Sequence, residues 1–265
     1  MSTQPIGIFD SGIGGLTVAR AVKDLLPQES LVYFGDTAHV PYGDKSTATI
    51  QAYALRICDF LLQKRCKVIL IACNSASAAA YDVICAQVGQ RAAVFNVIDP
   101  MIAYIGQQFQ GKSIGLIGTQ QTVQSGVYAQ KIQALGQNIQ LQALATPLLV
   151  PMIEAGFTQS PLSQEIIDYY LQNPVLKHIN ALILGCTHYP VIKTQLQAFY
   201  QGQVAVVEAT HLAAQALQQY LAHHQLLRTS VQVEDHFIVS DLTPAFAAAT
   251  RLFFQQPVHL EQLRA

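Results

Sequence analysis

The feature that most constrains this chain is a repeated succession of short apolar runs, turns of small or polar residues, and helical patterns. Residues 68–72 (VILIA) and 181–185 (ALILG) are uninterrupted apolar runs of strand length. Such runs are typical of strands buried on both faces, and their alternation with helices requires crossover connections between parallel strands. The sequence therefore predicts an α/β protein built from doubly wound, mainly parallel sheets.

The expected elements can be placed along the chain to within a few residues. Helical patterns cover 16–26 and 75–88, and Ser46 is a candidate cap for a helix that runs to about residue 64. A polar loop, residues 35–45, precedes that helix. Strands are expected at 5–9, 31–34, 68–72, 92–97, 113–117, 139–143, 181–184 and 204–207.

An internal repeat suggests two similar halves. The run 68–72 is followed by Cys73-Asn74-Ser75, and the run 181–185 by Cys186-Thr187-His188. A second pairing links Phe9-Asp10-Ser11-Gly12 with Ile117-Gly118-Thr119-Gln120. This pattern is expected of two α/β domains that face each other, with a ligand beyond the carboxyl ends of their strands. Breakpoints at Asp99-Pro100 and Glu208–Thr210 predict one domain from 1–97 plus 209–265 and a second from 98–208.

Composition excludes several classes of protein. Hydrophobic residues make up 51% of the 265 residues and charged residues 12%, against about 25% charged residues in a typical soluble domain. Such a chain can bury a large core, which excludes wholesale disorder. The net charge of −1 argues against a nucleic-acid partner. No apolar run approaches the roughly 18–20 residues that span a bilayer, so no membrane association is expected.

Cysteine usage and the N-terminus predict the compartment. Five scattered cysteines fit a reducing compartment better than a disulfide framework. The opening MSTQPIGIFD has no basic start and no apolar signal core, so we expect no secretion signal and a cytoplasmic protein. Sparse charge repels other copies of the chain only weakly, which is compatible with a homodimer.

The cysteines divide into two groups. Cys58, Cys66 and Cys85 fall in expected helical stretches and are predicted to be core residues. Cys73 and Cys186 instead follow apolar strands and precede helices, where the helix dipole is expected to lower a thiol pKa. Neither lies in a C-x-x-C or H-x-x-x-H pattern, so no metal site is expected. A Cys–His hydrolase with His188 as base stays open at this point.

Several polar segments are candidates for ligand binding. The Gly-rich turn 10–15 (DSGIGG) can bind a small anion, or it can be a tight turn with Ser11 as a helix cap. Asp10 at a strand end needs a partner. The other candidates have ordinary structural explanations when taken singly: Tyr42 and Gly43 in the polar loop, Thr119 and Thr122 as helix caps, and Glu154 as a surface carboxylate.

In combination these segments resemble the glutamate racemase family, within the aspartate/glutamate racemase superfamily. The resemblance spans the whole chain and is most specific around the two strand-end cysteines. Compared with the family pattern, Ser75 replaces a frequent Thr, Thr146 replaces a common Cys, and Glu208-Ala209-Thr210 replaces Asp-Ser-Ala. The matching segments are IGIFDSGIGGLTV at 6–18, YFGDTAHVPYGDKS at 33–46, IACNSASA at 71–78, GLIGTQQTV at 115–123, PLLVPMIEAGF at 147–157, ILGCTHYP at 183–190 and the ending SDLTPAFAAATRLFF.

The resemblance implies racemisation of glutamate without a cofactor, supplying D-glutamate for peptidoglycan. One cysteine would remove the Cα proton and the other would return a proton on the opposite face. The implied catalytic residues are Cys73 with Asp10 beside it, and Cys186 with His188 and its support Glu154. The implied substrate-binding residues are Asp10, Ser11, Tyr42, Gly43, Asn74, Ser75, Thr119, Thr122, Thr187 and His188.

Three other functions compete with this one. A racemase of the same superfamily could act on another acidic amino acid such as aspartate. A thiol hydrolase would need only one cysteine and a histidine. A non-catalytic module could simply hold an anion at the Asp10–Gly15 turn. A substrate panel and the loss of both thiols would separate these functions.

Overall fold

A computed structural model describes residues 2–229 and 234–263 of the chain. Within these residues the strands form two sheets, and every strand pairing is parallel. The first sheet has the order β10-β9-β2-β1-β3-β4. Its strands are β1 (Ile6–Asp10), β2 (Leu31–Gly35), β3 (Val68–Ile71), β4 (Ala93–Asn96), β9 (His236–Val239) and β10 (Leu260–Gln262).

The second sheet repeats the central order of the first. It runs β6-β5-β7-β8, which matches β2-β1-β3-β4 strand for strand. β3 and β7, which precede the two strand-end cysteines, therefore occupy equivalent places, and so do β1 and β5. The two similar halves predicted from the internal repeat are confirmed. The strands of the second sheet are β5 (Ser113–Gly118), β6 (Gln140–Ala145), β7 (Ala181–Gly185) and β8 (Ala205–Glu208).

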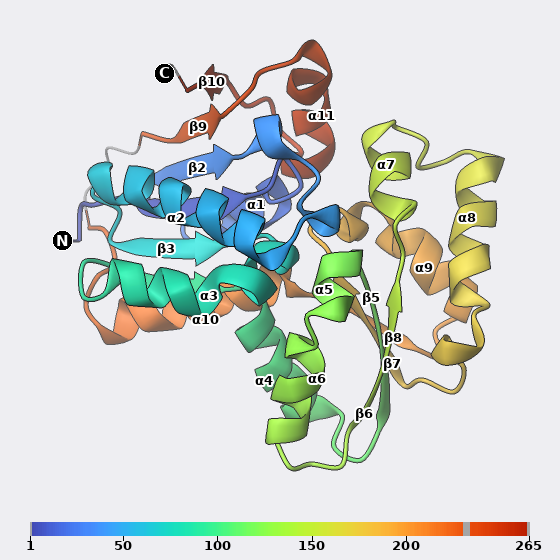
Figure 1. Ribbon diagram of the computed structural model, residues 1–265. Coiled ribbons are helices and arrows are strands. Elements are labelled where there is room, and N and C mark those ends of the chain that lie inside the picture. Colours follow the sequence, from blue (N-terminus) through green and yellow to red (C-terminus); the bar gives the residue numbers. More distant parts are fainter. Residues whose placement is uncertain (1, 230–233, 264–265) are drawn as a thin grey trace.

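Helices cover both sheets (Figure 1). Ser46 caps α2 as predicted, because its Oγ accepts a 3.2 Å hydrogen bond from the Thr49 N–H. The helices are α1 (Leu16–Leu25), α2 (Thr47–Gln63), α3 (Asn74–Val88), α4 (Ile98–Gln108), α5 (Gln120–Gln124), α6 (Val127–Ala134), α7 (Leu149–Glu154), α8 (Pro161–Leu171), α9 (Lys193–Tyr200), α10 (Ala209–His223) and α11 (Pro244–Phe254). Short 3₁₀ turns are η1 (Thr37–His39), η2 (Tyr42–Asp44), η3 (Pro174–Leu176) and η4 (Tyr189–Ile192). None of these helices is long and apolar enough to cross a bilayer.

The two faces of the first sheet bury alternate side chains of its strands. Ile8 and Leu70 belong to a core that continues into the second half, whereas Phe9 and Ile69 belong to a separate core beneath α2 and α3. All four side chains are fully buried. The burial of both faces explains why β3 (VILI) contains no polar residue, since neither of its faces meets water. The doubly wound α/β class is confirmed.

The C-terminal part of the chain returns to the first sheet. Although α10 follows β8, it packs against α1 and α4, and Figure 1 shows it (orange) along the first lobe. β9 and β10, which the sequence analysis did not predict, extend the first sheet beyond β2. Each has at most four residues, too few for a periodic pattern to be evident.

Two expectations about the minor cysteines need correction. Cys66 lies in the turn between α2 and β3 rather than in a helix, although it is buried as expected. Cys85 is on α3 but is only half-buried, because its helix position faces partly toward solvent. Cys58 is a fully buried core residue. All five cysteines are free thiols.

Candidate active site

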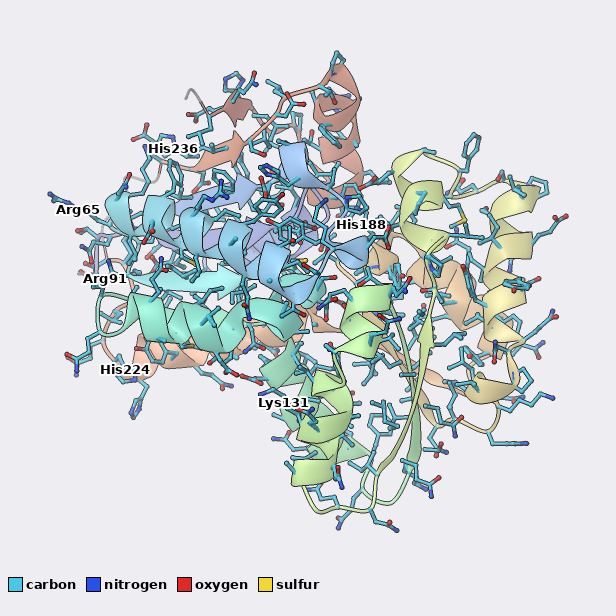
Figure 2. The ribbon with its side chains drawn as sticks, viewed as in Figure 1. Arg65, Arg91, Lys131, His188, His224 and His236 are labelled. Carbon is cyan, nitrogen blue, oxygen red and sulfur yellow. The ribbon has the colours of Figure 1, made fainter. Side chains whose placement is uncertain are left out.

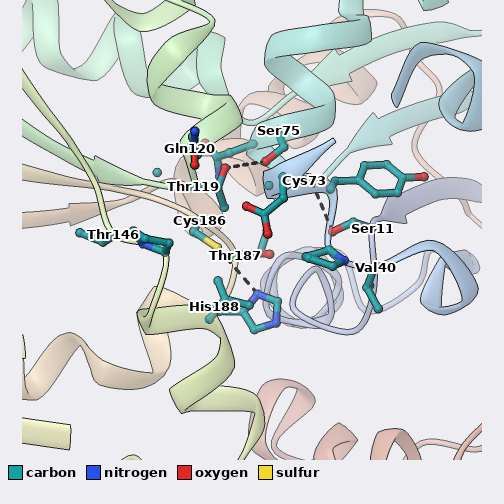
Figure 3. A pocket seen from close by; sticks show the side chains of 18 of the residues that line it. Ser11, Val40, Cys73, Ser75, Thr119, Gln120, Thr146, Cys186, Thr187 and His188 are labelled. Atoms are coloured by element: carbon teal, nitrogen blue, oxygen red, sulfur yellow. Dashed lines mark hydrogen bonds between the residues drawn. The ribbon is translucent and has the colours of Figure 1, made fainter. Parts of the chain in front are cut away.

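A cavity of about 240 Å³ lies between the two halves, at the carboxyl ends of their strands. Figure 2 shows His188 at the junction of the two lobes, and Figure 3 shows the cavity itself. This is the place where ligands bind in open α/β sheets. The lining residues are Ser11, Val40, Pro41, Tyr42, Gly43, Asp44, Cys73, Asn74, Ser75, Thr119, Gln120, Thr146, Pro147, Val150, Pro151, Glu154, Gly185, Cys186, Thr187 and His188.

Most of the predicted site residues therefore meet in one cavity. Asp10 and Thr122 are the two that do not line it; both are buried directly behind residues that do. Ser11 is not a helix cap, because α1 begins after Gly15 and has no side-chain cap. The alternative interpretation of the turn, as an anion-binding segment, is compatible with its place at the cavity.

Cys73 is held at the start of α3. It is the N-cap residue, and its Sγ accepts a 3.4 Å hydrogen bond from the Ala76 N–H. The thiol also donates to Ser11 Oγ at 3.6 Å. These contacts fix the sulfur between the Gly-rich turn after β1 and the first turn of α3.

The expected lowering of the Cys73 pKa is wrong. Burial and the negative charge of Asp10 raise the pKa of this thiol to about 12, and its hydrogen bonds with the Ala76 N–H and with Ser11 Oγ offset only part of that rise. The helix N-terminus is present as predicted, but removing the thiolate from water costs more than the dipole returns. Cys73 is therefore a protonated thiol at neutral pH.

Asp10 is a buried carboxyl group that joins the two halves. Its Oδ2 accepts from the Gly12 N–H at 3.0 Å, and its Oδ1 accepts from Thr187 Oγ1, in the other half, at 3.4 Å. Burial raises the pKa of Asp10, against the opposing effects of the His188 charge and of these hydrogen bonds. The partner that a carboxylate at a strand end requires is thus supplied by backbone amides and a threonine hydroxyl.

Cys186 has a different set of neighbours. Its Sγ lies 3.8 Å from His188 Nδ1, and His188 Nε2 lies 2.9 Å from Glu154 Oε1. Burial lowers the pKa of His188, but the hydrogen bonds and charges of Cys186 and Glu154 outweigh burial and raise it to about 10. His188 is thus an imidazolium at neutral pH, aimed at the sulfur. Glu154, a surface carboxylate when taken alone, forms the far end of this relay.

Two glycines allow the halves to approach closely. A Cβ at Gly14, in the turn after β1, would lie 2.4 Å from His188 Nδ1 and 2.6 Å from Thr187 Oγ1. A Cβ at Gly43 would lie 2.8 Å from Thr119 Cβ. Only glycine fits at either position without moving its neighbour. Each glycine comes from the first half and each neighbour from the second.

Hydroxyl groups also bridge the cavity. Ser75 Oγ, on the first turn of α3, lies 2.8 Å from Thr119 Oγ1 and 3.3 Å from Thr122 Oγ1, and the two threonines are 3.0 Å apart. Thr119 is the N-cap of α5, as predicted. The serine therefore keeps the hydroxyl that a threonine at this position would supply.

Three residues near the site were missed by the sequence analysis. Tyr128 donates a 2.8 Å hydrogen bond to Asn74 Oδ1. Asp36 accepts a 2.6 Å hydrogen bond from the Tyr42 hydroxyl. The ring of Phe253 stands edge-on to that of His188, with the centroids 5.1 Å apart. Asp36 lay inside the quoted segment 33–46, and only its place after a buried strand could have indicated a role.

The charges of the cavity limit its chemistry. Among the described residues no lysine or arginine lines it, and His188 is the one basic side chain of that lining. Within the described residues, no group of three or more His, Cys, Asp or Glu side chains could hold a metal ion. The lining is instead rich in hydroxyl groups and in two thiols, which suits proton transfer on a small polar molecule.

Comparison with known proteins identifies the family. The family model for Asp/Glu/Hydantoin racemase matches residues 16–217. A glutamate racemase of Chlorobaculum parvum is 39% identical over 253 residues, covering 95% of this chain and 93% of that protein. The crystal structure of a glutamate racemase from Francisella tularensis, in complex with D-glutamate, superposes with a TM-score of 0.94 at 36% identity, covering 100% of this chain and 98% of the other.

A second structure agrees with the first. The glutamate racemase from Thermus thermophilus, in complex with β-chloro-D-alanine, gives a TM-score of 0.88 at 37% identity and covers 99% of this chain and 97% of the other. Since both the family model and the relatives cover most of the chain, the likeness includes both halves and the cavity between them. The chain belongs to the Asp/Glu/Hydantoin racemase family, and the three relatives described above are glutamate racemases.

Proposed function

We propose that this protein interconverts L- and D-glutamate by proton transfer between Cα and two opposed thiols, Cys73 and Cys186. The observation that carries the proposal is that these cysteines follow equivalent strands, β3 and β7, and line one cavity from the two halves of the molecule. Inversion at Cα requires a proton to leave one face and another to arrive on the opposite face. A thiol hydrolase would use only one cysteine, so it would not explain the second thiol in the cavity.

The different neighbours of the two thiols suggest different starting roles. The imidazolium of His188 lies 3.8 Å from Cys186 Sγ and can donate a hydrogen bond to it, whereas Cys73 keeps its proton. With this arrangement Cys186 takes the Cα proton from one enantiomer and Cys73 protonates the other face. The roles are exchanged for the opposite enantiomer, so that each turnover moves the thiolate across the cavity.

Substrate carboxylates would be held by neutral donors. No lysine or arginine of the described ranges lines the cavity, so recognition falls to hydroxyls, amides and backbone N–H groups. We propose Asn74, Ser75 and Thr187 for the amino-acid head, and Ser11, Tyr42 and Gly43 for the carboxylates. Thr119 and Thr122 are secondary contacts. Donors fixed before the reaction can also stabilise the charge that develops when Cα loses its proton.

The substrate and the absence of a cofactor are part of this proposal. Glutamate is preferred over aspartate because the relatives at 33–39% identity are glutamate racemases and a related structure contains D-glutamate. No lysine, the residue that anchors pyridoxal phosphate, lines the cavity. The D-glutamate formed would serve peptidoglycan synthesis.

The domain boundaries, the location and the oligomeric state are also part of the proposal. The sheet membership of β9 and β10, and the packing of α10 on α1, support one domain of residues 1–97 plus 209–265 and a second of 98–208. Five free cysteines support a cytoplasmic location. Large exposed apolar side chains on and around α7 and α8 support a homodimer: Leu148, Phe157, Leu162 and Tyr169.

Isotope incorporation in heavy water tests the two-thiol proposal. Purified, dialysed protein is given L-glutamate, and both enantiomers are analysed by mass spectrometry from the earliest times. Product D-glutamate should carry deuterium at Cα from its first appearance, while the substrate stays largely unlabelled. The reason is that the returning proton comes from a thiol equilibrated with solvent. Unlabelled early product would mean that one base carries the original hydrogen across, which would refute opposed thiols.

A further inference from the structure

Tyr128 is a buried tyrosine that the proposed proton transfer does not use, yet its hydroxyl reaches the site. It lies on α6, which follows β5 of the second sheet, and its side chain is only 1% exposed. The hydroxyl donates a 2.8 Å hydrogen bond to Oδ1 of Asn74. Asn74 is the first residue of α3 and directly follows Cys73. This bond therefore ties the second half of the molecule to the residue next to a catalytic thiol.

The direction of this hydrogen bond decides which end of the Asn74 amide is free. A tyrosine hydroxyl donates one proton, and an asparagine amide has an accepting oxygen and a donating nitrogen. Burial, reinforced by the charge of Asp99, raises the pKa of Tyr128, so the hydroxyl stays protonated. With Oδ1 engaged, the amide N–H groups must find their partners elsewhere.

The free end of the amide is available to a ligand. Asn74 lines the cavity, and its one side-chain hydrogen bond within the described residues is made by Oδ1, which leaves Nδ2 unengaged. This nitrogen is also not one of the sealed polar atoms without a partner, which in the described chain are Gln137 Oε1 and the Tyr200 hydroxyl. A carboxylate accepts hydrogen bonds only, so a turned-over amide would present an oxygen and repel it.

We infer that Tyr128 is a positioning residue for substrate binding, which holds the Asn74 amide so that its N–H groups face the α-carboxylate of the substrate's amino-acid head. The inference rests on the proposed function. It matters in this cavity because, among the described residues, no lysine or arginine lines it to compensate for a misplaced neutral donor. The position of this donor also depends on the contact between the two halves, because Tyr128 lies on α6 of the second half and Asn74 on α3 of the first.

Tyr128→Phe tests the inference by separating KM from kcat. Loss of the anchor should raise KM about tenfold for both enantiomers, because a charged substrate group loses a fixed donor. The kcat should change by less than about threefold, since the thiols are untouched. The matched control is Tyr200→Phe, in the same half of the molecule, whose buried hydroxyl has no partner to lose; its KM should stay within about twofold. An equally small change for Tyr128→Phe would overturn the inference.

A double-mutant cycle shows whether Tyr128 acts through Asn74. Asn74→Ala should raise KM by itself, and adding Tyr128→Phe should then raise it no further. A purely structural tyrosine would instead multiply the KM of the Asn74→Ala variant by the same factor as that of the wild type. Multiplying effects would overturn the inference even if both single variants bind poorly.

A third variant tests the direction of the bond and keeps the inference testable if Tyr128→Phe does not fold. Para-aminophenylalanine at position 128 keeps a para N–H donor but is a poor acceptor. Its KM should stay within about threefold of wild type, with an unchanged melting temperature, and a tenfold rise would overturn the assigned direction. Wild-type racemisation in the same assay separates the two proposals. Its absence would refute the proposed function, whereas normal wild-type activity with an unaltered Tyr128→Phe variant refutes only this inference.

Discussion

The Cys73 and Cys186 sides of the cavity have the same strand framework but opposite electrostatics. Cys73 follows β3 and Cys186 follows β7, and each of these strands lies next to an edge strand of its sheet. Cys73 has a serine hydroxyl, a backbone N–H and the nearby Asp10 carboxyl group. Cys186 has His188, which is backed in turn by Glu154. A repeated fold has therefore received two different sets of partners.

This difference gives the two thiols neighbours of opposite charge. Burial and the negative charge of Asp10 keep a proton on Cys73, whereas Cys186 faces the imidazolium of His188. Two thiols or two thiolates cannot exchange one proton through Cα, so the proposed reaction needs one acid and one base at a time. Different partners on the two sides of the cavity are what that proposal requires.

Removal of either sulfur should have the largest effect. Cys73→Ala and Cys186→Ala are each expected to lower kcat/KM for racemisation by about 10⁴-fold or more, because inversion needs both an acid and a base. Polarimetry of L-glutamate over time measures this. Cys58→Ala, at a buried core position, is the control and should retain most of the activity. Near-normal racemisation by either site variant would mean that the two sides of the cavity do not act as an acid and a base.

Substitution of the charged residues beside the two sulfurs should have the next largest effect. His188→Asn and Asp10→Asn are each expected to lower activity by about 10²–10³-fold, since each assists proton transfer at a different sulfur. The equilibrium constant between enantiomers is unity, so kcat/KM must remain equal in both directions for every variant. The asymmetry should appear in the separate kcat values, whose ratio between L-to-D and D-to-L reactions should shift in opposite senses for the two variants. A shift in the same sense would mean that both residues serve one thiol or only bind substrate.

The strands that place the two cysteines were predictable from the sequence, but the charges around the two sulfurs were not. Continuous apolar runs identified β3 and β7, and the repeated cysteine after each run predicted two equivalent halves, because strands buried on both faces leave a strong local pattern. β9 and β10 escaped prediction because such short strands depend on distant pairing, β9 with β2 and β10 with β9.

The pKa of Cys73 shows most clearly why the site could be predicted only in part. Its position before α3 was correct, and that position alone favours a thiolate. Depth of burial and the approach of Asp10 decide the opposite outcome, and both depend on tertiary packing. Tyr128 was missed for the same reason, since a tyrosine on the inner face of a helix is typical of a core residue until its hydroxyl is seen to meet Asn74.

A methyl group on the Gly-rich turn should disturb the Cys186 side more than the Cys73 side. Gly14→Ala would place Cβ 2.4 Å from His188 Nδ1, so the imidazole must move away from the sulfur. We expect a loss of about 10–100-fold in kcat/KM, because small misplacements of a catalytic group are costly. Gly12→Ala, in the same turn, meets only Val40 Cγ1 at 3.0 Å and should lose far less. Equal losses would show that the turn tolerates no substitution for reasons unrelated to His188.

The smallest expected effect comes from the residue farthest from the sulfur, Glu154. Its hydrogen bond and charge help to raise the pKa of His188 to about 10, against the opposing effect of burial. In the folded protein His188 therefore keeps its proton up to about pH 10. The stability that this proton contributes is fully present below the unfolded pKa of about 6.5. That stability is lost as the pH rises through about 10. Glu154→Gln keeps the size of the side chain but removes the charge, so the pKa of His188 should fall.

The measurement is the pH dependence of kcat in both directions for wild type and Glu154→Gln. In the wild type the alkaline limb that reports loss of the imidazolium should lie near pH 10. In the variant it should move to lower pH, while activity at neutral pH falls by less than about tenfold, since Cys186 still contacts His188. An alkaline limb that stays in place would mean that Glu154 does not act on the Cys186 side, and that the contrast between the two thiols rests on His188 by itself.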